Sequence, residues 1–355
     1  MANQVLYGFL NLKDAFSERI EDVGVGVVNA AIDATIAEHN RALNDLMSLF
    51  VDNTTQYKLR NKVPGAASLQ PLDENGRALP VKVAGYYDIA FPLQMAGIAW
   101  GQTYYASKKM RVEDANNTMA TLVTADKRWM RDRIMAALFT NVNWTFTDPE
   151  HGSLTIKPLA NGDTDTYLIQ AGTDAGATDT HFLAQAAAIA DATDPFPAIY
   201  TELAEHPENS GDVVAFIPTS NKAAVEALSG FYPTTDPNLR VGSAATVVSG
   251  SLGATIPGTL FGYHEAGVWL AEWKALPANY LIATMTGGPR PIGMREEPES
   301  SLRGFNRVAE RNDYPFFESQ YLRVAGFGAQ NRVGAVVQRV SNGAYAIPTN
   351  YTAPL

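Results

Sequence analysis

The 355-residue sequence contains no cysteine. This absence excludes disulfide bonds, zinc–thiolate sites and cysteine nucleophiles together. The sequence also lacks any run of 18 or more apolar residues, the length that a membrane-spanning helix needs. Residues Met1 to Leu12 have no basic region followed by a long apolar stretch, as a secretory signal would. We expect a protein that is soluble and cytoplasmic when it is synthesised, with no membrane partner.

Charged residues are scarce, at 18% of the chain, and the net charge is −10. A protein that grips phosphates usually carries a basic face, so this charge argues against sequence-specific recognition of DNA. It does not exclude nucleic acid inside a container, because a container wall need not bind its contents tightly. Aromatic residues do not interleave with a basic patch, so stacking on single-stranded nucleic acid is also unsupported.

The sequence motifs of known catalytic sites are missing as well. There is no G-x-S-x-G nucleophile elbow and no Walker loop, and Gly24 and Gly26 lack the third glycine of a dinucleotide fingerprint. The five histidines, at positions 39, 151, 181, 206 and 264, form no H-E-x-x-H motif and no pair at metal-ligand spacing. We therefore predict no catalytic residue, no metal site and no cofactor. A carboxylate pair stays open, because such a pair needs only spatial proximity.

The sequence does contain enough apolar material for a core, because 46% of its residues are hydrophobic. Its length corresponds to about two average domains. In residues 14–50, apolar side chains recur at three- and four-residue steps, which predicts one helix, or two with a break at Gly24 and Gly26. This segment packs either on its own domain or, as an arm, on a neighbouring subunit, since both arrangements bury the same stripe.

Residues 112–140 form the strongest predicted helix, because an apolar stripe runs through them without glycine or proline. At 1.5 Å per residue this helix is roughly 40 Å long, enough to cross a whole domain as a spine. We interpret its charged residues from Asp126 to Arg133 as a solvated face. His39 lies on the apolar stripe of the first helix and is interpreted as a packing residue with its polar atoms satisfied.

A hairpin is predicted around the Asn75-Gly76 dipeptide, because Asn-Gly accepts the positive φ angles of a tight turn. Residues 56–63 alternate in polarity before this turn, and Leu79, Val81 and Val83 return as a strand after it. A lone hairpin is only marginally stable in water. This one should therefore need something to lie against, such as another chain.

Residues 86–95 alternate almost perfectly, and Pro92 indicates an edge strand. The residues expected on one face are Tyr87, Ile89, Phe91, Leu93 and Met95. The continuous apolar run Val213–Ile217 predicts a strand covered on both faces.

Short helices are expected at 197–206 and 222–229, and residues 233–260 predict an exposed loop. Strands are expected within 260–272, 279–286 and 317–340.

Arginine replaces lysine in the last third of the chain: after Lys274 there is no lysine, yet there are eight arginines. Arginine suits fixed, planar pairing with carboxylates, whereas lysine suits loosely solvated charge. We interpret these residues either as contacts between subunits or as ordinary surface ion pairs, which contribute little each. The candidate inter-subunit contacts, including three from the hairpin, are Arg303, Arg307, Glu310, Arg311, Asp313, Lys58, Arg60 and Lys62.

The order of these elements resembles the major capsid proteins of tailed bacteriophages, whose fold is named after the phage Hong Kong 97 and is shared by encapsulin nanocompartments. The resemblance covers nearly the full chain, but its motifs are diffuse. It rests on Phe91–Met95 leading to Arg111–Glu113, on Pro257–Tyr263, and on the tail from Tyr321 to Pro348. Some family members carry a cleavable scaffolding segment before the arm. Here the arm begins almost at Met1, so scaffolding is expected to be a separate protein or dispensable.

The resemblance implies an α+β chain with the Hong Kong 97-type capsid fold. Residues 1–55 would be the N-terminal arm and 56–90 the extended loop hairpin. The peripheral domain would combine 91–195, including spine helix 112–140, with 300–355, and residues 196–299 would form the axial domain.

The resemblance also implies assembly into homo-pentamers and homo-hexamers of an icosahedral shell around the double-stranded DNA of a phage. Such a protein would be assembled in the bacterial host cytoplasm and become part of the virion capsid, with a scaffolding protein, portal and decoration protein as further partners. It would not be an enzyme. One alternative is an encapsulin-like compartment shell. An alternative of another class is a carboxylate-dependent hydrolase, which predicts a compact monomer or small oligomer.

Overall fold

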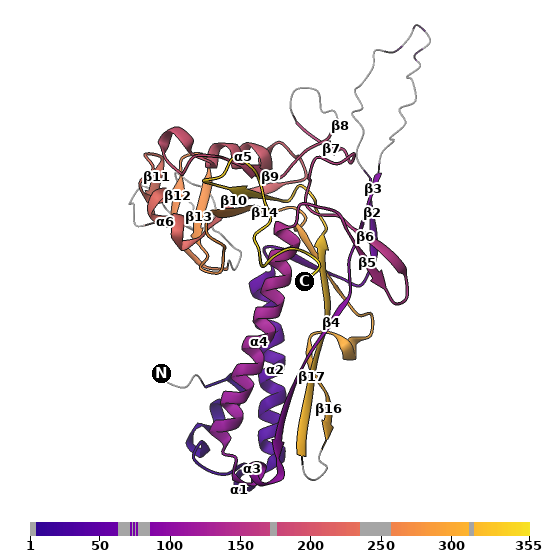
Figure 1. The fold of residues 1–355 in the computed structure, drawn as a ribbon, viewed down its shortest axis with the longest axis vertical. Helices are drawn as coiled ribbons and strands as arrows, with labels where there is room; N and C mark the ends of the chain where they lie inside the picture. The colour runs from indigo at the N-terminus through magenta and orange to yellow at the C-terminus, as the bar shows by residue number, and fades with distance from the viewer. Residues whose placement is uncertain are drawn as a thin grey trace.

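The computed structural model describes residues 5–62, 72, 74, 76, 86–170, 176–234, 257–311 and 316–355. Within these residues the chain forms an upper body around a seven-stranded sheet and a long limb of helices and strands below it (Figure 1). We call the part built from α2 (Val25–Met47), α4 (Val112–Phe139), β4 (Gln94–Thr103), β16 (Phe305–Arg311) and β17 (Phe316–Ala329) the limb. No helix among the described residues is long and apolar enough to cross a membrane.

Two long helices form one side of the limb, and they run in the same direction. Val28 and Ile32 of the first pack near Val112 of the second, whereas Met47 shares a cluster with Ile134 further along. The helical elements of this region are η1 (Tyr7–Ala15), α1 (Ile20–Val23), α2 (Val25–Met47), α3 (Tyr104–Lys109) and α4 (Val112–Phe139).

The predicted break in the first helix is confirmed at Gly24. This glycine has a φ of 106° between α1 and α2, a conformation that side-chain-bearing residues rarely adopt. The spine helix is also confirmed, since α4 covers nearly all of residues 112–140. Both helices bury the apolar stripes that predicted them.

The other side of the limb is a five-stranded sheet with β17 at its centre. β17 pairs with β4 along one edge and with β16 and β15 along the other, and β1 pairs with β15. The strands are β1 (Val51–Thr54), β4 (Gln94–Thr103), β15 (Ile292–Glu296), β16 (Phe305–Arg311) and β17 (Phe316–Ala329). β4 is an edge strand, as Pro92 indicated.

The expectation of one continuous face along residues 86–95 is wrong. Tyr87, Ile89 and Phe91 are buried, but Met95 is 75% exposed. β3 (Tyr86–Ala90) ends before Pro92 and β4 begins after it, so two separate strands replace the single predicted one. The chain changes its partner strand at Pro92, because β3 pairs with β2 (Lys58–Lys62) and β4 pairs with β17. The alternation of buried and exposed side chains restarts in β4 with the opposite side facing solvent.

The upper body is a mixed sheet with β10 at its middle. The strands, in order across the sheet, are β11 (Phe231–Pro233), β12 (Thr259–His264), β13 (Val268–Glu272), β10 (Ser210–Ile217), β14 (Tyr280–Gly287), β18 (Ala335–Arg339) and β9 (Phe182–Ala184). β10 pairs in parallel with β13 and antiparallel with β14.

Burial of β10 on both faces confirms the prediction from its apolar run. Val213, Ala215 and Ile217 pack beneath α5 (Phe196–Ala204) and α6 (Thr219–Glu226). Val214 and Phe216 face the opposite way, into a cluster that includes the upper ends of α2 and α4. The predicted short helices correspond to α5 and α6, although α6 begins three residues earlier than expected at 222.

Sheet pairing joins distant parts of the chain. β18 lies in the same sheet as β10, and β15 lies in the same sheet as β17. β1, at the end of residues 1–55, also belongs to the five-stranded sheet. The division into arm, loop, peripheral and axial parts therefore stays a proposal about how the chain is used in an assembly.

Three small two-stranded sheets complete the fold. β2 (Lys58–Lys62) pairs antiparallel with β3, as the hairpin prediction requires. Gly76 has a φ of 70°, the conformation that its predicted turn needs, whereas Asn75, Leu79, Val81 and Val83 lie outside the described residues. So does most of the loop expected at 233–260. The other pairs are β5 (Trp144–Asp148) with β6 (Gly152–Ile156) and β7 (Tyr167–Leu168) with β8 (Gly176–Ala177).

Candidate assembly surfaces

The base of the hairpin has an anchored inner face and a charged outer face. Tyr87 and Ile89 are buried in a cluster with Phe91. On the outer face, Asp88 accepts a hydrogen bond from Nε of Arg60 and forms an ion pair with Nζ of Lys58. The donor–acceptor distance is 2.7 Å in each case. The hydrogen bonds from Arg60 and Lys58 hold the pKa of the Asp88 carboxyl well below its usual range. This outer face therefore carries a fixed pattern of charge at physiological pH.

Two predicted contact residues, Lys58 and Arg60, thus have a partner within their own chain. Their side chains are still 43% and 57% exposed. The Arg60 guanidinium also lies 4.2 Å from the centre of the Tyr86 ring, which is itself 61% exposed. Lys62 is the last residue of β2. Their contact with a neighbouring subunit stays a prediction.

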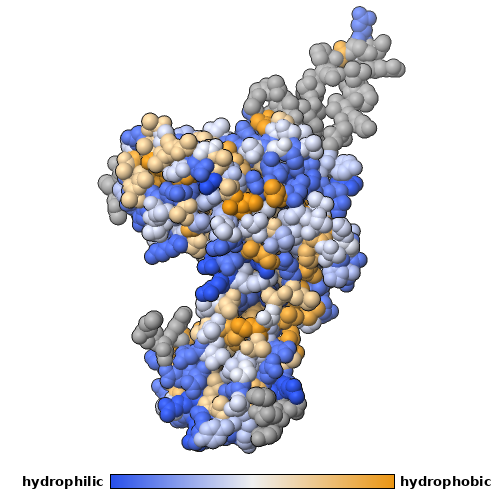
Figure 2. All heavy atoms as spheres, in the orientation of Figure 1, coloured by the Kyte–Doolittle hydropathy of each residue, from blue (hydrophilic) through white to orange (hydrophobic). Residues whose placement is uncertain are grey.

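A second surface is a groove of mixed polarity near the start of α2. Its apolar lining comes from α1, from the first turns of α2 and from the facing strands, and consists of Ile20, Val25, Val28, Ile32, Trp100 and Phe317. Charged side chains line it as well, among them those of Glu21, Lys108 and Glu318. Tyr105 of α3 is 73% exposed. Hydrophobic atoms are visible on the surface of the limb (Figure 2).

The arginines of the last third are held mainly by partners within the chain. Arg303 donates to the backbone oxygens of Glu297 and Pro298 at 2.7 and 2.6 Å. Arg307 lies 3.1 Å from Asp33 of α2 and 3.8 Å from Glu310.

Arg311 ends β16, and Asp313 lies outside the described residues. The fixed geometry that arginine suggested is therefore present inside the protomer, and a role between subunits stays a prediction.

The interpretation of Asp126 as part of a solvated face is wrong. It is 5% exposed and binds two residues from other elements. Arg323 of β17 donates to both of its oxygens, at 2.5 and 2.7 Å, and His39 of α2 lies 2.6 Å away. Arg323 also donates to Asn40 at 3.0 Å. We call these four side chains the limb network.

The limb network joins α2, α4 and β17 by directional contacts. Burial raises the pKa of the Asp126 carboxyl, but the hydrogen bonds from His39 and Arg323 outweigh burial and hold it below its usual value. Asp126 is therefore ionised although it is buried. The interpretation of His39 as a packing residue is confirmed in part, since His39 is buried and its Nε2 is satisfied.

Two further arginines of the last third are buried in the same manner. Arg295 donates to Asp148 at 2.6 Å and to the backbone oxygen of Phe91. Arg332 is fully buried and reaches Asp163 and Asp165 at 3.0 and 2.5 Å. Neither pairing is visible in the sequence, because more than 140 residues separate each arginine from its carboxylate.

Sequence reasoning missed one group of side chains altogether. His181 and His206, which are 25 residues apart, meet in the upper body beside Asp179. Glu202 and Glu205 lie next to the same aspartate. Burial and the charges of Asp179 and Glu205 raise the pKa of Glu202 to about 8. Only the fold brings these residues together, so spacing along the chain gave no signal for them.

The arrangement of a hairpin base, a spine helix, a five-stranded sheet along it and a seven-stranded upper body is the Hong Kong 97-type capsid fold. The expected α+β class and this fold are therefore confirmed. The chain is similar to a structure from Mycobacterium phage Patience, with a TM-score of 0.68, 18% sequence identity, and coverage of 93% of this chain and 91% of that chain.

Weaker likenesses extend to other particles. One is the mature capsid of bacteriophage PhiM1, at a TM-score of 0.49 and 7% identity, covering 84% of this chain and 88% of that one. Another is a virus-like particle from Pyrococcus furiosus, at a TM-score of 0.40 and 10% identity, covering 87% and 98%. No protein-family model and no curated protein matches the sequence.

Proposed function

We propose that this protein is the major capsid protein of a tailed bacteriophage. Copies would assemble into pentamers and hexamers of an icosahedral shell that encloses the double-stranded DNA genome. The observation that carries this proposal is the Hong Kong 97-type fold, which extends over 93% of the chain in the likeness to the Mycobacterium phage Patience structure.

In this proposal each part of the chain has a separate role in the lattice. Residues 196–299, as the axial domain, gather around five- and six-fold axes. Residues 1–55 and the extended loop 56–90 lie over neighbouring subunits. The peripheral domain, from 91–195 and 300–355, forms the spine of each subunit. Lateral contacts would use the exposed charges of the hairpin and of β16, with Lys58, Arg60, Lys62, Arg303, Arg307, Glu310, Arg311 and Asp313 as candidates.

The shell would hold DNA by containment. A net charge of −10 does not favour tight binding to phosphates, so the wall needs no sequence-specific contact with its contents. Assembly would take place in the bacterial cytoplasm and the finished protein would lie in the virion capsid. Further partners would be a separate scaffolding protein, a portal and a decoration protein.

The two alternative functions predict a different assembly or different contents of the shell. An encapsulin-like shell would enclose a protein cargo instead of a genome. A carboxylate-dependent hydrolase would be a compact monomer or small oligomer. The long limb, which projects from the upper body (Figure 1), favours an assembling protein over that enzyme.

Negative-stain electron microscopy of the purified protein, alone and after a shift in salt or pH, tests the proposal. We expect closed shells, tubes, or rings of five and six subunits. A uniform monomer or dimer under every condition, and also after co-expression with a scaffolding protein, would contradict it. Nuclease-protected double-stranded DNA in particles from infected cells supports the phage shell, whereas an enclosed enzyme supports the encapsulin-like one.

A hairpin-deletion variant makes this test specific. Lys62 and Tyr86 are paired neighbours on antiparallel strands, so a two-residue Asn-Gly turn can replace residues 63–85. We expect this variant to keep the melting temperature of the wild type, because Tyr87 and Ile89 still anchor the hairpin base. It should fail to form shells. Normal shells from this variant would remove the hairpin from the assembly mechanism.

A further inference from the structure

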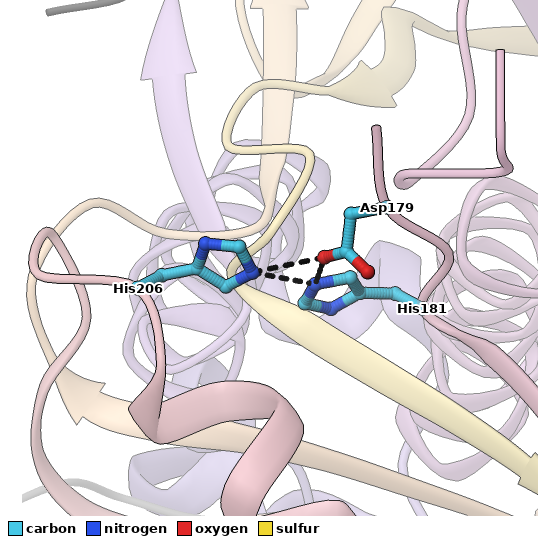
Figure 3. A group of neighbouring side chains, drawn as sticks. All are labelled: Asp179, His181 and His206. Atoms are coloured by element: carbon cyan, nitrogen blue, oxygen red, sulfur yellow. Dashed lines mark hydrogen bonds and ion pairs between the residues drawn. The ribbon is translucent and has the colours of Figure 1, made fainter. Parts of the chain in front are cut away.

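Asp179, His181 and His206 converge on one point in the upper body (Figure 3). His181 directly precedes β9, and His206 follows the end of α5. Their Nε2 atoms are 3.1 Å apart, and Oδ2 of Asp179 lies 2.9 Å from the first and 3.0 Å from the second. Both imidazole side chains are fully buried, and the Asp179 side chain is 10% exposed.

The backbone fixes where the ring protons lie. Nδ1 of His181 is 2.9 Å from the carbonyl oxygen of Ala335, and Nδ1 of His206 is 3.0 Å from that of Leu168. A carbonyl oxygen only accepts hydrogen bonds, so each Nδ1 must carry a hydrogen and donate it. In a neutral imidazole the other nitrogen then has only a lone pair.

Three acceptors therefore point at each other: two imidazole lone pairs and a carboxylate oxygen. Acceptors at about 3 Å repel unless a cation lies between them, and burial away from water strengthens that repulsion. The cation is either a metal ion or a proton added to the imidazoles. The carboxyl groups of Glu202 and Glu205 lie beside Asp179 and offer further oxygen ligands, which suits a metal ion.

We propose that Asp179, His181 and His206 bind a divalent transition-metal ion of the zinc type. Zinc takes imidazole and carboxylate ligands at about 2.0–2.2 Å in tetrahedral geometry, which places ligand atoms roughly 3.3 Å apart. The three ligand atoms here are separated by 2.9 to 3.1 Å, so a small outward shift accommodates the ion. Two nitrogens and one oxygen also suit zinc better than calcium or magnesium, which prefer oxygen ligands alone.

The surroundings have the features of a metal centre. Hydrogen bonds from Nδ1 of a ligating histidine to backbone carbonyls orient the ring toward the ion and select the tautomer. Both histidines have such a bond. Glu202 or Glu205 could supply a fourth ligand, or a water could do so, because both glutamates are only partly buried and open the site toward solvent.

The ion would join two separate parts of the chain. Asp179 and His181 lie between β8 and β9 of the seven-stranded sheet, and His206 follows the end of α5. No disulfide can make this connection, because the chain has no cysteine. A metal bound by the folded chain only would stabilise the upper body, since its binding free energy adds to the free energy of folding.

The test uses the full-length wild-type protein, stripped with a chelator and then dialysed against Zn²⁺. We expect one zinc per chain by elemental analysis, and the absorption spectrum of a tetrahedral site when Co²⁺ replaces Zn²⁺. Saturating Zn²⁺ should raise the melting temperature by about 5 °C or more over the chelated protein. Mg²⁺ and Ca²⁺ should leave it unchanged. Zinc bound well below one per chain, or equal melting temperatures with zinc and chelator, would overturn the proposal and leave protons as the cation.

Two variants separate ligation from structure. His206→Asn keeps a side-chain donor for the carbonyl oxygen of Leu168 and removes the Nε2 ligand, so it should lose the zinc and the Co²⁺ spectrum. His264→Gln changes another buried histidine, which lies 3.2 Å from Asp194, and should keep both. Full zinc occupancy in His206→Asn would overturn the assignment of that ligand. None of these readouts depends on shell formation, so the site stands or falls separately from the capsid proposal.

Discussion

The upper body and the limb bury their central strands in different ways. In the upper body, the residues of β10 from Val213 to Ile217 are at most 1% exposed and contact only apolar clusters on both faces. In the limb, β17 meets the two long helices partly through Arg323, which is buried against Asp126 and His39. The apolar contacts of β10 are non-directional, whereas the contacts of Arg323 depend on donors and acceptors in fixed positions.

This difference indicates different roles for the two regions. Buried ion pairs add little net stability, because their desolvation offsets their attraction, yet removing one partner is strongly destabilising. The limb network therefore selects one arrangement of α2, α4 and β17. A lattice subunit needs a limb of defined shape, and we infer that the limb network fixes that shape while the apolar core around β10 supplies stability.

The largest effect is expected from Asp126→Ala. It leaves the Arg323 guanidinium buried without its carboxylate, so the free energy of unfolding should fall by about 3–5 kcal/mol. Guanidinium-chloride unfolding of the unassembled protein measures this. Asp132→Ala, on the same helix but in a half-exposed pair with Arg131, is the matched control and should cost less than about 1 kcal/mol. Equal losses in the two variants would remove the distinction between the limb network and surface pairs.

A conservative exchange in each region gives a smaller but sharper contrast. Arg323→Lys keeps the charge and loses the two-pronged contact, so we expect a loss of about 1.5–3 kcal/mol. Ile282→Leu in the upper body keeps volume and polarity, and should cost less than about 1.5 kcal/mol. Ile282 is fully buried, so both are core positions. Equal losses of unfolding free energy in Arg323→Lys and Ile282→Leu would show that the direction of the Arg323 hydrogen bonds is unimportant for the limb.

The same contrast explains what the sequence could predict. The apolar run of β10 and the stripe of α4 determine burial locally, and both predicted elements are present. The break at Gly24 was visible because glycine has a backbone requirement of its own. The course of residues 86–95 could not be predicted, since the change of partner at Pro92 depends on β17, which lies more than two hundred residues away.

Polar sites followed no local rule. Asp126 was interpreted as solvated because its neighbours Lys127 and Arg128 are charged, and only the position of Arg323 shows otherwise. His181 and His206 are placed by a strand and a helix end, so no motif spacing links them. Candidate contacts such as Arg303 could be recognised by residue type, but not their partners, which are backbone oxygens of the same chain.

Acid should weaken the limb network through Asp126. The pKa of Asp126 lies below its ordinary value of about 4, so its stabilising contribution is complete above that value. The contribution is lost as the pH falls through the lower, folded-state pKa. The difference in unfolding free energy between the wild type and Asp126→Asn should therefore shrink as the pH falls below about 4. A difference that stays constant or grows below that pH would contradict an ionised Asp126.

The smallest effect on stability is expected at the hairpin base, with Asp88→Ala. Its pairs with Lys58 and Arg60 are largely exposed, and exposed pairs contribute about 0–1 kcal/mol because water and salt screen them. The subunit should therefore unfold as the wild type does. Shell assembly should still suffer, because Asp88 orders two cations that we propose to meet a neighbouring subunit. Electron microscopy at low and high salt measures the yield of shells. If Asp88→Ala gives as many shells as the wild type at both salt concentrations, the hairpin charges are not an assembly contact.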